Sequence, residues 1–367
     1  MKILVRFDYV WLGGSTTQEF RNKTRYSHIE VENPQTQPQL GEVLSQVPEW
    51  SFDGSSTNQS EPEYSDLLLR PVKIYPNPFA MQGQGSMPSF IVFCEVFNID
   101  GTPHETNTRS KLRETVDSTE NNSSLIFGVE QEYVFWDSTK DWPSGWQWDN
   151  ENDTGVYPEE QGRYYCGVGP DLILHRQLVE QHAQICLSSG IPVEGFNAEV
   201  MKSQWEYQLA PLSALEAADS LWISRYYLIR IAEARGICVS FDPKPVAGDW
   251  NGSGAHINFS DKDMREGTME VVDEVCKHLG EHHKDSMSVY GEDNDQRLTG
   301  THETSSLDKF TFGELDRTAS VRIPLVTINN DGAGYLEDRR PSANMDPYLA
   351  FSSLVSLLCE QKEEVLV

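Results

Sequence analysis

The spacing of apolar residues changes near residue 100, and this change limits the folds open to the chain. Before it, short apolar runs such as 7–12 and 89–97 end at turns that contain glycine, which is typical of β-strands. After it, apolar residues recur at three- and four-residue spacing, as in the amphipathic helix predicted over 171–189. The pattern predicts an α+β protein with a small β-domain over 1–104 and a larger α+β domain over 105–367.

Three local predictions bear on how the second domain and the polar loops are built. A helix is predicted over 211–234, where Ser213 and Glu216 form a capping box, and another over 263–284. The segment 48–57 is rich in serine and contains two aromatic residues, and it is predicted to be a polar loop.

The charge of the chain is strongly negative. It has 29 Lys and Arg against 57 Asp and Glu, a formal net charge of -28 over 367 residues. Such a chain is poorly suited to hold nucleic acid or an anionic membrane through its own basic groups. An anionic substrate such as a nucleotide would need metal ions or a local cluster of arginines.

Nothing in the sequence predicts secretion or a membrane anchor. No stretch approaches ~20 uninterrupted apolar residues, and the apolar run at the start is too short for a signal peptide. The six cysteines are scattered without a Cys-x-x-Cys pair, which favours reduced thiols over disulfides or a zinc site. We therefore expect a cytoplasmic protein.

Two pairs of glutamates lie in apolar surroundings. Glu130 and Glu132 alternate with apolar residues in a predicted strand, so their side chains share one face. Glu199 and Glu206 lie among residues that look buried. Neighbouring carboxylates repel each other unless a cation or a proton intervenes, and buried acids need partners. The alternative for the first pair is an ordinary solvated strand face.

A glycine-rich segment and a basic cluster complete the candidate chemistry. Residues 248–254 contain three glycines, which permit close approach of backbone to a ligand, and His256 follows at the start of a strand. Guanidinium groups suit phosphate and carboxylate oxygens, and four of them stand out in this acidic chain: Arg297, Arg317, Arg322 and Arg339. Surface arginines paired with acids are the alternative. The sequence has no P-loop, dinucleotide-binding or nucleophile-elbow motif.

Together these segments resemble one family, glutamine synthetase, in its shorter eukaryotic-type (type II) class, which also occurs in bacteria. The matching stretches run nearly end to end and comprise residues 50–57, 128–133, 164–169, 197–201, 204–208, 250–256, 297–300, 302–304 and 337–344. The combination is highly specific, and the chain length fits the class.

The resemblance implies a β-grasp-like N-terminal domain, a C-terminal catalytic domain and the synthesis of glutamine from glutamate, ammonia and ATP. The γ-carboxylate of glutamate would attack the terminal phosphate of ATP, and ammonia would displace phosphate from the resulting γ-glutamyl phosphate. Two to three Mg²⁺ or Mn²⁺ ions per site would bridge phosphate oxygens. The family match assigns one metal to Glu132, Glu199 and Glu206, and a second metal to Glu130, His256 and Glu337.

The match also implies roles for other residues. Asp53 would draw in ammonium and take its proton, and Glu303 would shield the acyl phosphate from water. Arg339 and Arg317 would neutralise the phosphoryl group in transfer. The implied substrate contacts are Arg297, Asn251 and Gly252 for glutamate, Arg322 for nucleotide phosphates, Tyr165 and Ser56 for ammonium, and Pro211 and Tyr335 near the adenine.

In this family the active site forms between neighbouring subunits of a homo-oligomer. The N-terminal domain of one subunit supplies Asp53 to the catalytic domain of the next, in two stacked five-membered rings. This chain departs from the family at three positions, since Ser51 and Asp316 stand where Asn is usual and Ile126 where Trp is frequent. The added charge of Asp316 is expected either to weaken nucleotide binding or to hydrogen-bond through its neighbour.

Other activities remain open beside the main expectation. A γ-glutamyl-amine ligase on the same fold would use a larger amine, but intact Asp53 and Glu303 favour ammonia. A non-catalytic ring-forming homologue predicts lost metal ligands, and all six are present. A guanidino kinase would not explain the paired metal sets.

Overall fold

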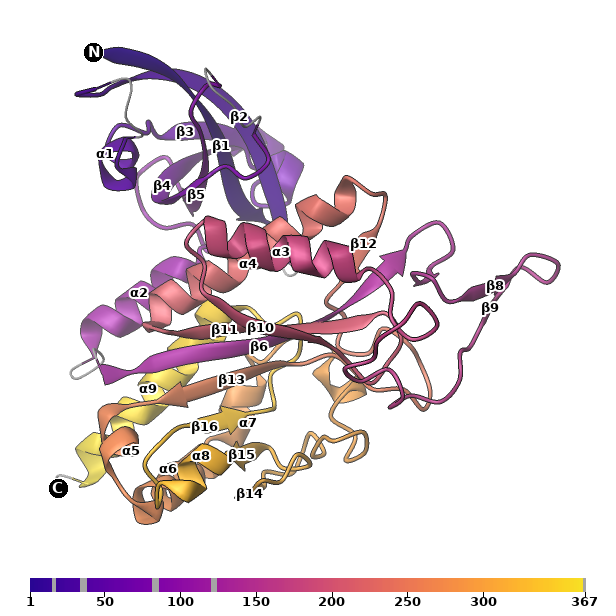
Figure 1. Cartoon of the computed structure of the whole chain (residues 1–367). Helices are drawn as coiled ribbons and strands as arrows, with labels where there is room; N and C mark the ends of the chain where they lie inside the picture. The colour runs from indigo at the N-terminus through magenta and orange to yellow at the C-terminus, as the bar shows by residue number, and fades with distance from the viewer. Residues whose placement is uncertain (15–17, 34–37, 81–85, 120–123, 366–367) are drawn as a thin grey trace. The chain divides into compact units, whose positions relative to one another are not determined.

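The computed structural model describes residues 1–14, 18–33, 38–80, 86–119 and 124–365. The chain divides into two compact units, one of Met1–Lys111 with Ser188–Gly190 and one of Leu112–Leu187 with Ile191–Val367. Each unit contains its own sheet, and helices are concentrated in the second, so the predicted α+β class is confirmed (Figure 1). The boundary at residues 104 and 105 stays a prediction. Among the described residues, no helix is both long and apolar enough to cross a membrane.

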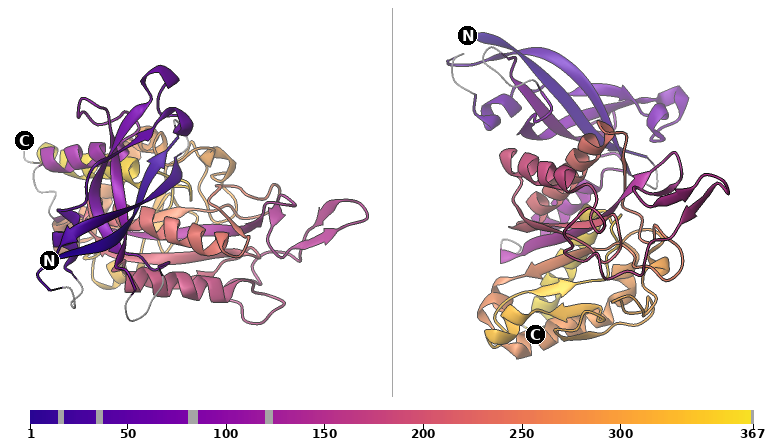
Figure 2. Two further views of the ribbon diagram at one scale, coloured as in Figure 1. Left: turned by 90° about the horizontal axis from the view of Figure 1, so that it is seen from above. Right: turned by 45° about the vertical axis from the view of Figure 1, so that its right-hand side comes forward.

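The first unit is a curved five-stranded sheet in the order β2-β1-β5-β4-β3 (Figures 1 and 2). Its strands are β1 Lys2–Gly13, β2 Glu19–Glu30, β3 Trp50–Asp53, β4 Asp66–Pro76 and β5 Ser89–Phe97, with the short helix α1 Leu40–Leu44 beside them. Alternate residues of β1, namely Val5, Phe7, Tyr9 and Trp11, enter one hydrophobic core because successive side chains of a strand point to opposite faces. β1 pairs antiparallel with β2 and parallel with β5.

The prediction of a loop over 48–57 is wrong in its middle. Residues Trp50–Asp53 form β3, which pairs antiparallel with β4. Phe52 is buried in the core, and the ring of Trp50 packs edge-on against Tyr9 at 5.3 Å between centroids. Four residues with two aromatics give too short an alternation to distinguish a strand from a loop, so long-range pairing decides.

The second unit is built on a larger, mostly antiparallel sheet with β6 Ile126–Asp137 near its middle. The strand order is β10-β11-β6-β13-β16-β15-β14, and β12 and β7 also pair with β6. The bounds are β7 Trp142–Pro143, β10 Val193–Ala198, β11 Gln204–Leu212, β12 Cys238–Ser240, β13 Ala255–Ser260, β14 Phe312–Glu314, β15 Val321–Ile323 and β16 Leu336–Asp338. A separate hairpin of β8 Gln147–Asp149 and β9 Thr154–Val156 extends away from this sheet (Figure 2).

Helices cover the sheet of the second unit. The long helices α4 Ala214–Glu233 and α9 Pro347–Val365 pack against each other, and α4 also contacts β6, β11 and β12. The others are α2 Thr108–Ser118, α3 Arg176–Ser188, α5 Lys262–Glu266, α6 Met269–Glu281, α7 His283–Met287 and α8 Leu325–Asn329. The buried side of α4 places Arg225 beneath β6, a position that bears on the site described below.

Two of the three predicted helices are present with altered ends, and the third is broken into shorter helices. The first begins at Arg176, because His175 before it has a left-handed φ of 62°. Ser213 is the N-cap of α4, but its hydroxyl donates to the Glu216 carboxylate at 3.1 Å and makes no side-chain cap bond. The predicted helix over 263–284 is broken into α5, α6 and α7. At the first break a Cβ on Gly267 would lie 2.4 Å from the Asp263 carbonyl oxygen.

A buried histidine in α3 makes the stability of the second unit sensitive to acid. The Nε2 atom of His182 lies 2.9 Å from the Ser224 carbonyl oxygen, and burial lowers the pKa of His182 from 6.5 to about 4. Between these two pH values His182 is protonated in the unfolded chain but stays neutral in the folded chain. Stability that is present above pH 6.5 is therefore lost as the pH falls toward 4. At pH 5 the loss amounts to about 2 kcal/mol.

We expect His182→Gln, which keeps a donor for Ser224 and does not titrate, to flatten this dependence. Urea unfolding followed by tryptophan fluorescence at pH 7 and pH 5 is the measurement. The wild type should lose about 2 kcal/mol more than the variant between the two. Equal losses would show that His182 does not carry the effect. His28→Gln, on the half-exposed strand β2, is the matched control.

Candidate active site

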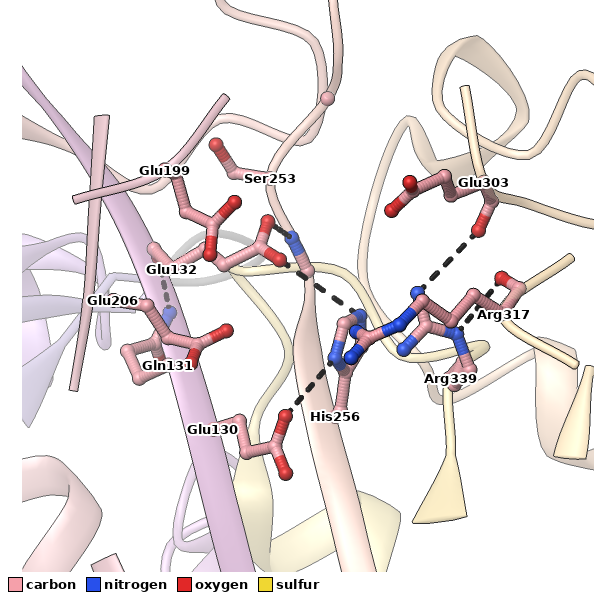
Figure 3. A network of polar contacts seen from close by, with 12 residues as sticks. Glu130, Gln131, Glu132, Glu199, Glu206, Ser253, His256, Glu303, Arg317 and Arg339 are labelled. Carbon is pink, nitrogen blue, oxygen red and sulfur yellow. Dashed lines mark hydrogen bonds and ion pairs between the residues drawn. The ribbon is translucent and has the colours of Figure 1, made fainter. Parts of the chain in front are cut away.

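The register of five strands brings predicted acids, His256 and Arg322 together on one face of the second sheet. Antiparallel pairing of β6 with β11 sets Glu206 opposite Glu132, and pairing of β6 with β13 sets His256 opposite Glu130. Pairing of β15 with β16 sets Arg322 opposite Glu337. In Figure 3, Glu130, Glu132, Glu199 and Glu206 lie on one side of His256, and Arg339, Arg317 and Glu303 lie on the other.

One group of ligand atoms consists of Glu130, His256 and Glu337, whose donor atoms all lie within 4.8 Å of one another. The Nδ1 atom of His256 is 3.6 Å from Oε2 of Glu130 and 3.5 Å from Oε1 of Glu337. Asn258 donates to the other oxygen of Glu130 at 2.8 Å. This group coincides with the second metal set that the family resemblance implies.

A second group consists of Glu132, Glu206 and His256, again within 4.8 Å. The resemblance places Glu199 with the two glutamates. In the structure Glu199 instead accepts hydrogen bonds from Asn197 Nδ2 at 2.9 Å and from the Val200 amide at 3.1 Å. Glu199 is nevertheless coupled to the group by charge, since burial and then Glu132 raise its pKa to about 8.

The electrostatics of these acids fit a site for cations. Burial is the main cause that raises the pKa of both Glu132 and Glu206, and neighbouring glutamates add to it at Glu206. Burial also lowers the pKa of His256, so its imidazole is neutral and able to act as a ligand. Within the described part of the chain, Nδ1 of His256 is buried and makes no hydrogen bond. Carboxylates that repel one another beside an imidazole nitrogen without a hydrogen-bond partner form a donor set that a metal ion would complete.

The glycine-rich segment allows backbone to pass close to this group. The amide of Gly254 donates to Oε2 of Glu132 at 2.7 Å. A Cβ on Gly254 would lie 2.4 Å from Nη2 of Arg297, and one on Gly252 would lie 2.3 Å from the Pro243 carbonyl oxygen. A larger residue at Gly252 would displace the loop that borders the acids, and one at Gly254 would displace the Arg297 guanidinium.

Arg339 joins three segments of the site. Its Nη1 pairs with Oε1 of Glu337 at 2.5 Å, and its Nε donates to the Arg317 carbonyl at 3.1 Å. Its Nη2 reaches the Glu303 carbonyl oxygen at 3.5 Å. Arg322 Nη1 holds the other oxygen of Glu337 at 2.7 Å. Two guanidinium groups thus compensate the buried charge of Glu337.

Arg297 is buried beside the same group. Burial lowers its pKa to about 10, and its Nη2 lies 3.2 Å from Nε2 of His256. The guanidinium also donates to the Arg339 carbonyl at 3.1 Å and to the Arg340 carbonyl at 3.3 Å. Carbonyl dipoles are weak counter-charges, so Arg297 retains capacity for a carboxylate ligand.

The remaining predicted residues lie at the edges of the site or in the first unit. Tyr165 is half exposed, Pro211 is exposed at the end of β11, and the amide of Tyr335 donates to Thr327 Oγ1 at 3.0 Å. Asp53 and Ser56 belong to the first unit. There Asp53 accepts hydrogen bonds from Ser55 Oγ at 2.7 Å and Ser56 Oγ at 2.6 Å, which lower its pKa to about 2.

The extra acid at position 316 is stabilised in its charged form by local hydrogen bonds. Oδ1 of Asp316 accepts from the amide of Thr318 at 2.8 Å and from its hydroxyl at 2.7 Å. These bonds lower the pKa of Asp316, so it remains charged. Of the two expectations for this position, hydrogen bonding through a neighbour is the one observed.

Sequence reasoning missed two pairs of residues that support the site. Arg340 forms a bidentate ion pair with Asp338 at 2.9 and 2.7 Å, fully buried on the face of β16 opposite Glu337 and Arg339. A run of four charged residues in a strand could have revealed the pair, because two of the four must point inward. The other pair is Arg225 and Gln131, joined at 2.8 Å beneath β6. Gln131 lies between two glutamates of a predicted strand, and that position is its only sequence signal.

Buried acids facing a cluster of arginines across one sheet are the arrangement of an enzyme that handles anionic substrates. Residues 105–279 match the family described as "Glutamine synthetase, catalytic domain". The glutamine synthetase of Yarrowia lipolytica is 46% identical over 86% of this chain and 83% of its own length. That of Streptomyces viridochromogenes is 44% identical over 97% of each chain, and that of Saccharomyces cerevisiae 40% identical over 96% of this chain and 88% of its own.

The chain therefore belongs to the glutamine synthetase family, and the resemblance noted in the sequence is confirmed. Homology this close over most of the chain assigns it glutamine synthetase activity, that of a glutamate–ammonia ligase.

Proposed function

We propose that this chain makes glutamine in two steps on the acid-lined face of the second sheet. An oxygen of the glutamate γ-carboxylate attacks the terminal phosphorus of ATP, and the bond to the bridging oxygen breaks to release ADP. The nitrogen of ammonia then attacks the acyl carbon of γ-glutamyl phosphate, and the carbon–oxygen bond to phosphate breaks. The observation that carries this proposal is the pairing of Glu337 with both Arg339 and Arg322 beside the two ligand groups.

The acids divide between two cation sites in this proposal. Glu130, His256 and Glu337 hold one ion, and Glu132, Glu206 and Glu199 hold the other. Oxygen-rich donor sets favour Mg²⁺ or Mn²⁺, and two to three such ions would neutralise and polarise the phosphate oxygens of ATP.

The arginines do the remaining electrostatic work. Arg339 and Arg322 hold Glu337 until phosphate oxygens arrive, and each guanidinium then offers free N–H donors to those oxygens. Arg317 lies beside them through its carbonyl contact with Arg339. For the other substrates, the proposed contacts are Arg297 for the α-carboxylate of glutamate, Asn251 and Gly252 in the same glutamate site, Pro211 and Tyr335 near the adenine, and Tyr165 and Ser56 near ammonium.

Asp53 supplies the carboxylate that attracts ammonium and accepts its proton. The two serine hydroxyls keep it ionised, because a hydrogen-bonded carboxylate with a pKa of about 2 is charged at any working pH. We expect Asp53→Ala to lower the rate of glutamine formation by roughly 10²–10⁴-fold, the range for loss of a positioned proton acceptor. Nucleotide affinity, measured by fluorescence titration, should stay unchanged.

The first unit offers a matched control for this variant. Asp100 is also exposed and also accepts hydrogen bonds from the amide and hydroxyl two residues on, at 2.9 and 2.6 Å. Asp100→Ala should leave glutamine formation intact. Loss of nucleotide binding in Asp53→Ala would contradict the role proposed for Asp53.

The whole proposal is tested by following phosphate release from ATP, Mg²⁺ and glutamate with and without ammonium. We expect ammonium to stimulate the release and glutamine to appear in equal amount. Stimulation by an organic amine alone would favour the γ-glutamyl-amine ligase. No turnover with any amine would favour the non-catalytic homologue.

We also propose that the chain works in the cytoplasm as two stacked five-membered rings, with Asp53 of one subunit serving the site of its neighbour. The family membership of the chain supports this assembly. Mass photometry should then give a particle ten times the 41.6 kDa mass of the chain. A monomeric particle with full activity would overturn it.

A further inference from the structure

The turn that carries Glu303 has an unfavourable backbone. The amide of Thr304 donates to the Thr301 carbonyl at 3.2 Å, so residues 301–304 close a tight turn. Its two central residues, His302 and Glu303, have left-handed φ values of 55° and 60°. A turn with two such residues normally takes glycine or asparagine, and neither is present. Contacts outside the turn must hold it in place.

His302 makes such contacts at both ring nitrogens. Its Nε2 lies 3.1 Å from Oδ1 of Asp249, and its Nδ1 lies 3.1 Å from Nε2 of Gln161. The oxygen of the same Gln161 amide accepts from the backbone amide of Asn251 at 2.7 Å. The His302 side chain is mostly buried, with 18% of it exposed, whereas that of Asp249 is 99% exposed.

The donors and acceptors run in one direction around this group. A backbone amide can only donate, so the Asn251 contact fixes the oxygen of Gln161 and turns its NH₂ group toward Nδ1 of His302. Nδ1 then accepts, and the proton of the neutral ring lies on Nε2, where it is donated to Asp249. Asp249 and Asn251 are two residues apart, so one loop holds both nitrogens of the His302 ring, directly through Asp249 and by way of Gln161 through the Asn251 amide.

That loop is firmly anchored. Trp250 between the two contacts is buried, and its ring packs 4.9 Å from that of Trp146. Gly252 lies so close to the Pro243 carbonyl that no side chain fits. Elsewhere the turn meets its own approach segment, where Thr301 Oγ1 lies 2.8 Å from Thr299 Oγ1. Its contacts with Arg339 Nη2, at 3.5 Å from the Glu303 carbonyl, and with the Arg297 carbonyl, at 3.3 Å from Thr304 Oγ1, are longer. The loop is therefore the fixed element, and the turn is placed against it through His302.

We propose that His302 is a positioning residue for the ligase reaction, and that its ring of hydrogen bonds with Asp249, Gln161 and the Asn251 amide holds the Glu303 turn over the acyl phosphate. This inference rests on the proposed function and on the shielding role that the family resemblance implies for Glu303. Asp249 serves as acceptor for Nε2, and Gln161 transmits the position of the Asn251 backbone to Nδ1.

If these hydrogen bonds are lost, we expect a side reaction in which water hydrolyses γ-glutamyl phosphate. Water attacks the acyl carbon of γ-glutamyl phosphate, the carbon–oxygen bond to phosphate breaks, and glutamate and inorganic phosphate are released. ATP is then consumed without glutamine. The quantity to measure is the ratio of phosphate to glutamine formed, which is one for the coupled reaction.

The experiment compares variants of the full chain under saturating ATP, Mg²⁺, glutamate and ammonium. His302→Ala and Asp249→Ala remove the ring and should raise the phosphate-to-glutamine ratio roughly tenfold or more, as small misplacements of positioned groups do. Asp249→Asn keeps an acceptor oxygen for Nε2 of His302, so its phosphate-to-glutamine ratio should stay near one. His282→Ala, a partly exposed histidine outside this network, is the control.

His302→Asn distinguishes the effect of the hydrogen bonds of His302 from the effect of the left-handed backbone. Asparagine tolerates the left-handed conformation, but its side chain is too short to bridge Asp249 and Gln161. We expect this variant to lose coupling as His302→Ala does. A phosphate-to-glutamine ratio of one in His302→Asn would show that only the turn conformation matters and would overturn the inference. A ratio of one in both His302→Ala and Asp249→Ala would overturn it as well.

Failure of the proposed function gives a different result from failure of this inference. If Glu303→Gln keeps a ratio of one, the shielding role of Glu303 is wrong. If Glu303→Gln loses coupling but the His302 and Asp249 variants do not, Glu303 shields and His302 does not position it. Coupling lost in all three supports the inference.

Discussion

Replacing Arg339 with alanine should lower kcat roughly 10³-fold, the low end of the range for an arginine that stabilises a phosphoryl group in transfer. Arg339 is 7% exposed and pairs with Glu337 at 2.5 Å. Burial alone would lower its pKa, but Glu337 outweighs burial and the pKa is raised, so the charge is permanent. The same guanidinium also holds the Arg317 and Glu303 carbonyls, so its removal loosens three segments.

The kinetic pattern identifies this role. If Arg339 acts mainly in the transition state, kcat should fall far more than the affinity for ATP, measured from phosphate release over a range of ATP concentrations. Arg339→Lys keeps the charge but loses the planar fork, and should lie between wild type and alanine. Arg235→Ala, an exposed arginine at the end of α4, is the control. A change of less than about twofold in kcat for Arg339→Ala would exclude the role.

Glu206→Gln should abolish most activity and yet stabilise the protein in the absence of divalent ions. Glu206 is 8% exposed opposite Glu132, and burial followed by Glu130 raises its pKa. Without cations these carboxylates repel one another, so an isosteric neutral side chain relieves the repulsion. Activity should fall at least about 100-fold, since even outer partners of metal ligands cost 10–100-fold.

Calorimetry in EDTA and in Mg²⁺ measures the melting temperature of the variant without and with divalent ions. In EDTA the melting temperature of Glu206→Gln should exceed that of the wild type by about 2 °C or more, which corresponds to roughly 1 kcal/mol in a unit of this size. The rise in melting temperature on adding Mg²⁺ should be smaller than in the wild type. Glu180→Gln, on the exposed side of α3, should change neither value. A lower melting temperature of Glu206→Gln than of the wild type in EDTA would show that repulsion between these carboxylates does not destabilise the protein.

Local patterns in the sequence were sufficient for the strand that carries Glu130 and Glu132 and for the longest predicted helix. The period of two that places Glu130 and Glu132 on one face depends only on neighbouring residues, and it holds in β6. The helix predicted over 211–234 survives as α4 with Ser213 at its N-cap, because its apolar and capping residues lie within a few turns. Where the local signal was short or ambiguous, prediction failed, as for the strand of Trp50–Asp53 and the three helices in 263–284.

The amino-acid sequence by itself determined which side chains are available: five glutamates and a histidine set among apolar residues, and four arginines in an acidic chain. Only the tertiary structure decided that Glu206 faces Glu132, that Arg339 and Arg322 share Glu337, and that Gln161 and Asp249 meet at His302. The physical reason is range. Periodicity is fixed by bonded neighbours, whereas strand register and loop contacts depend on packing between segments far apart in the sequence, such as Gln161 and His302, which are 141 positions apart.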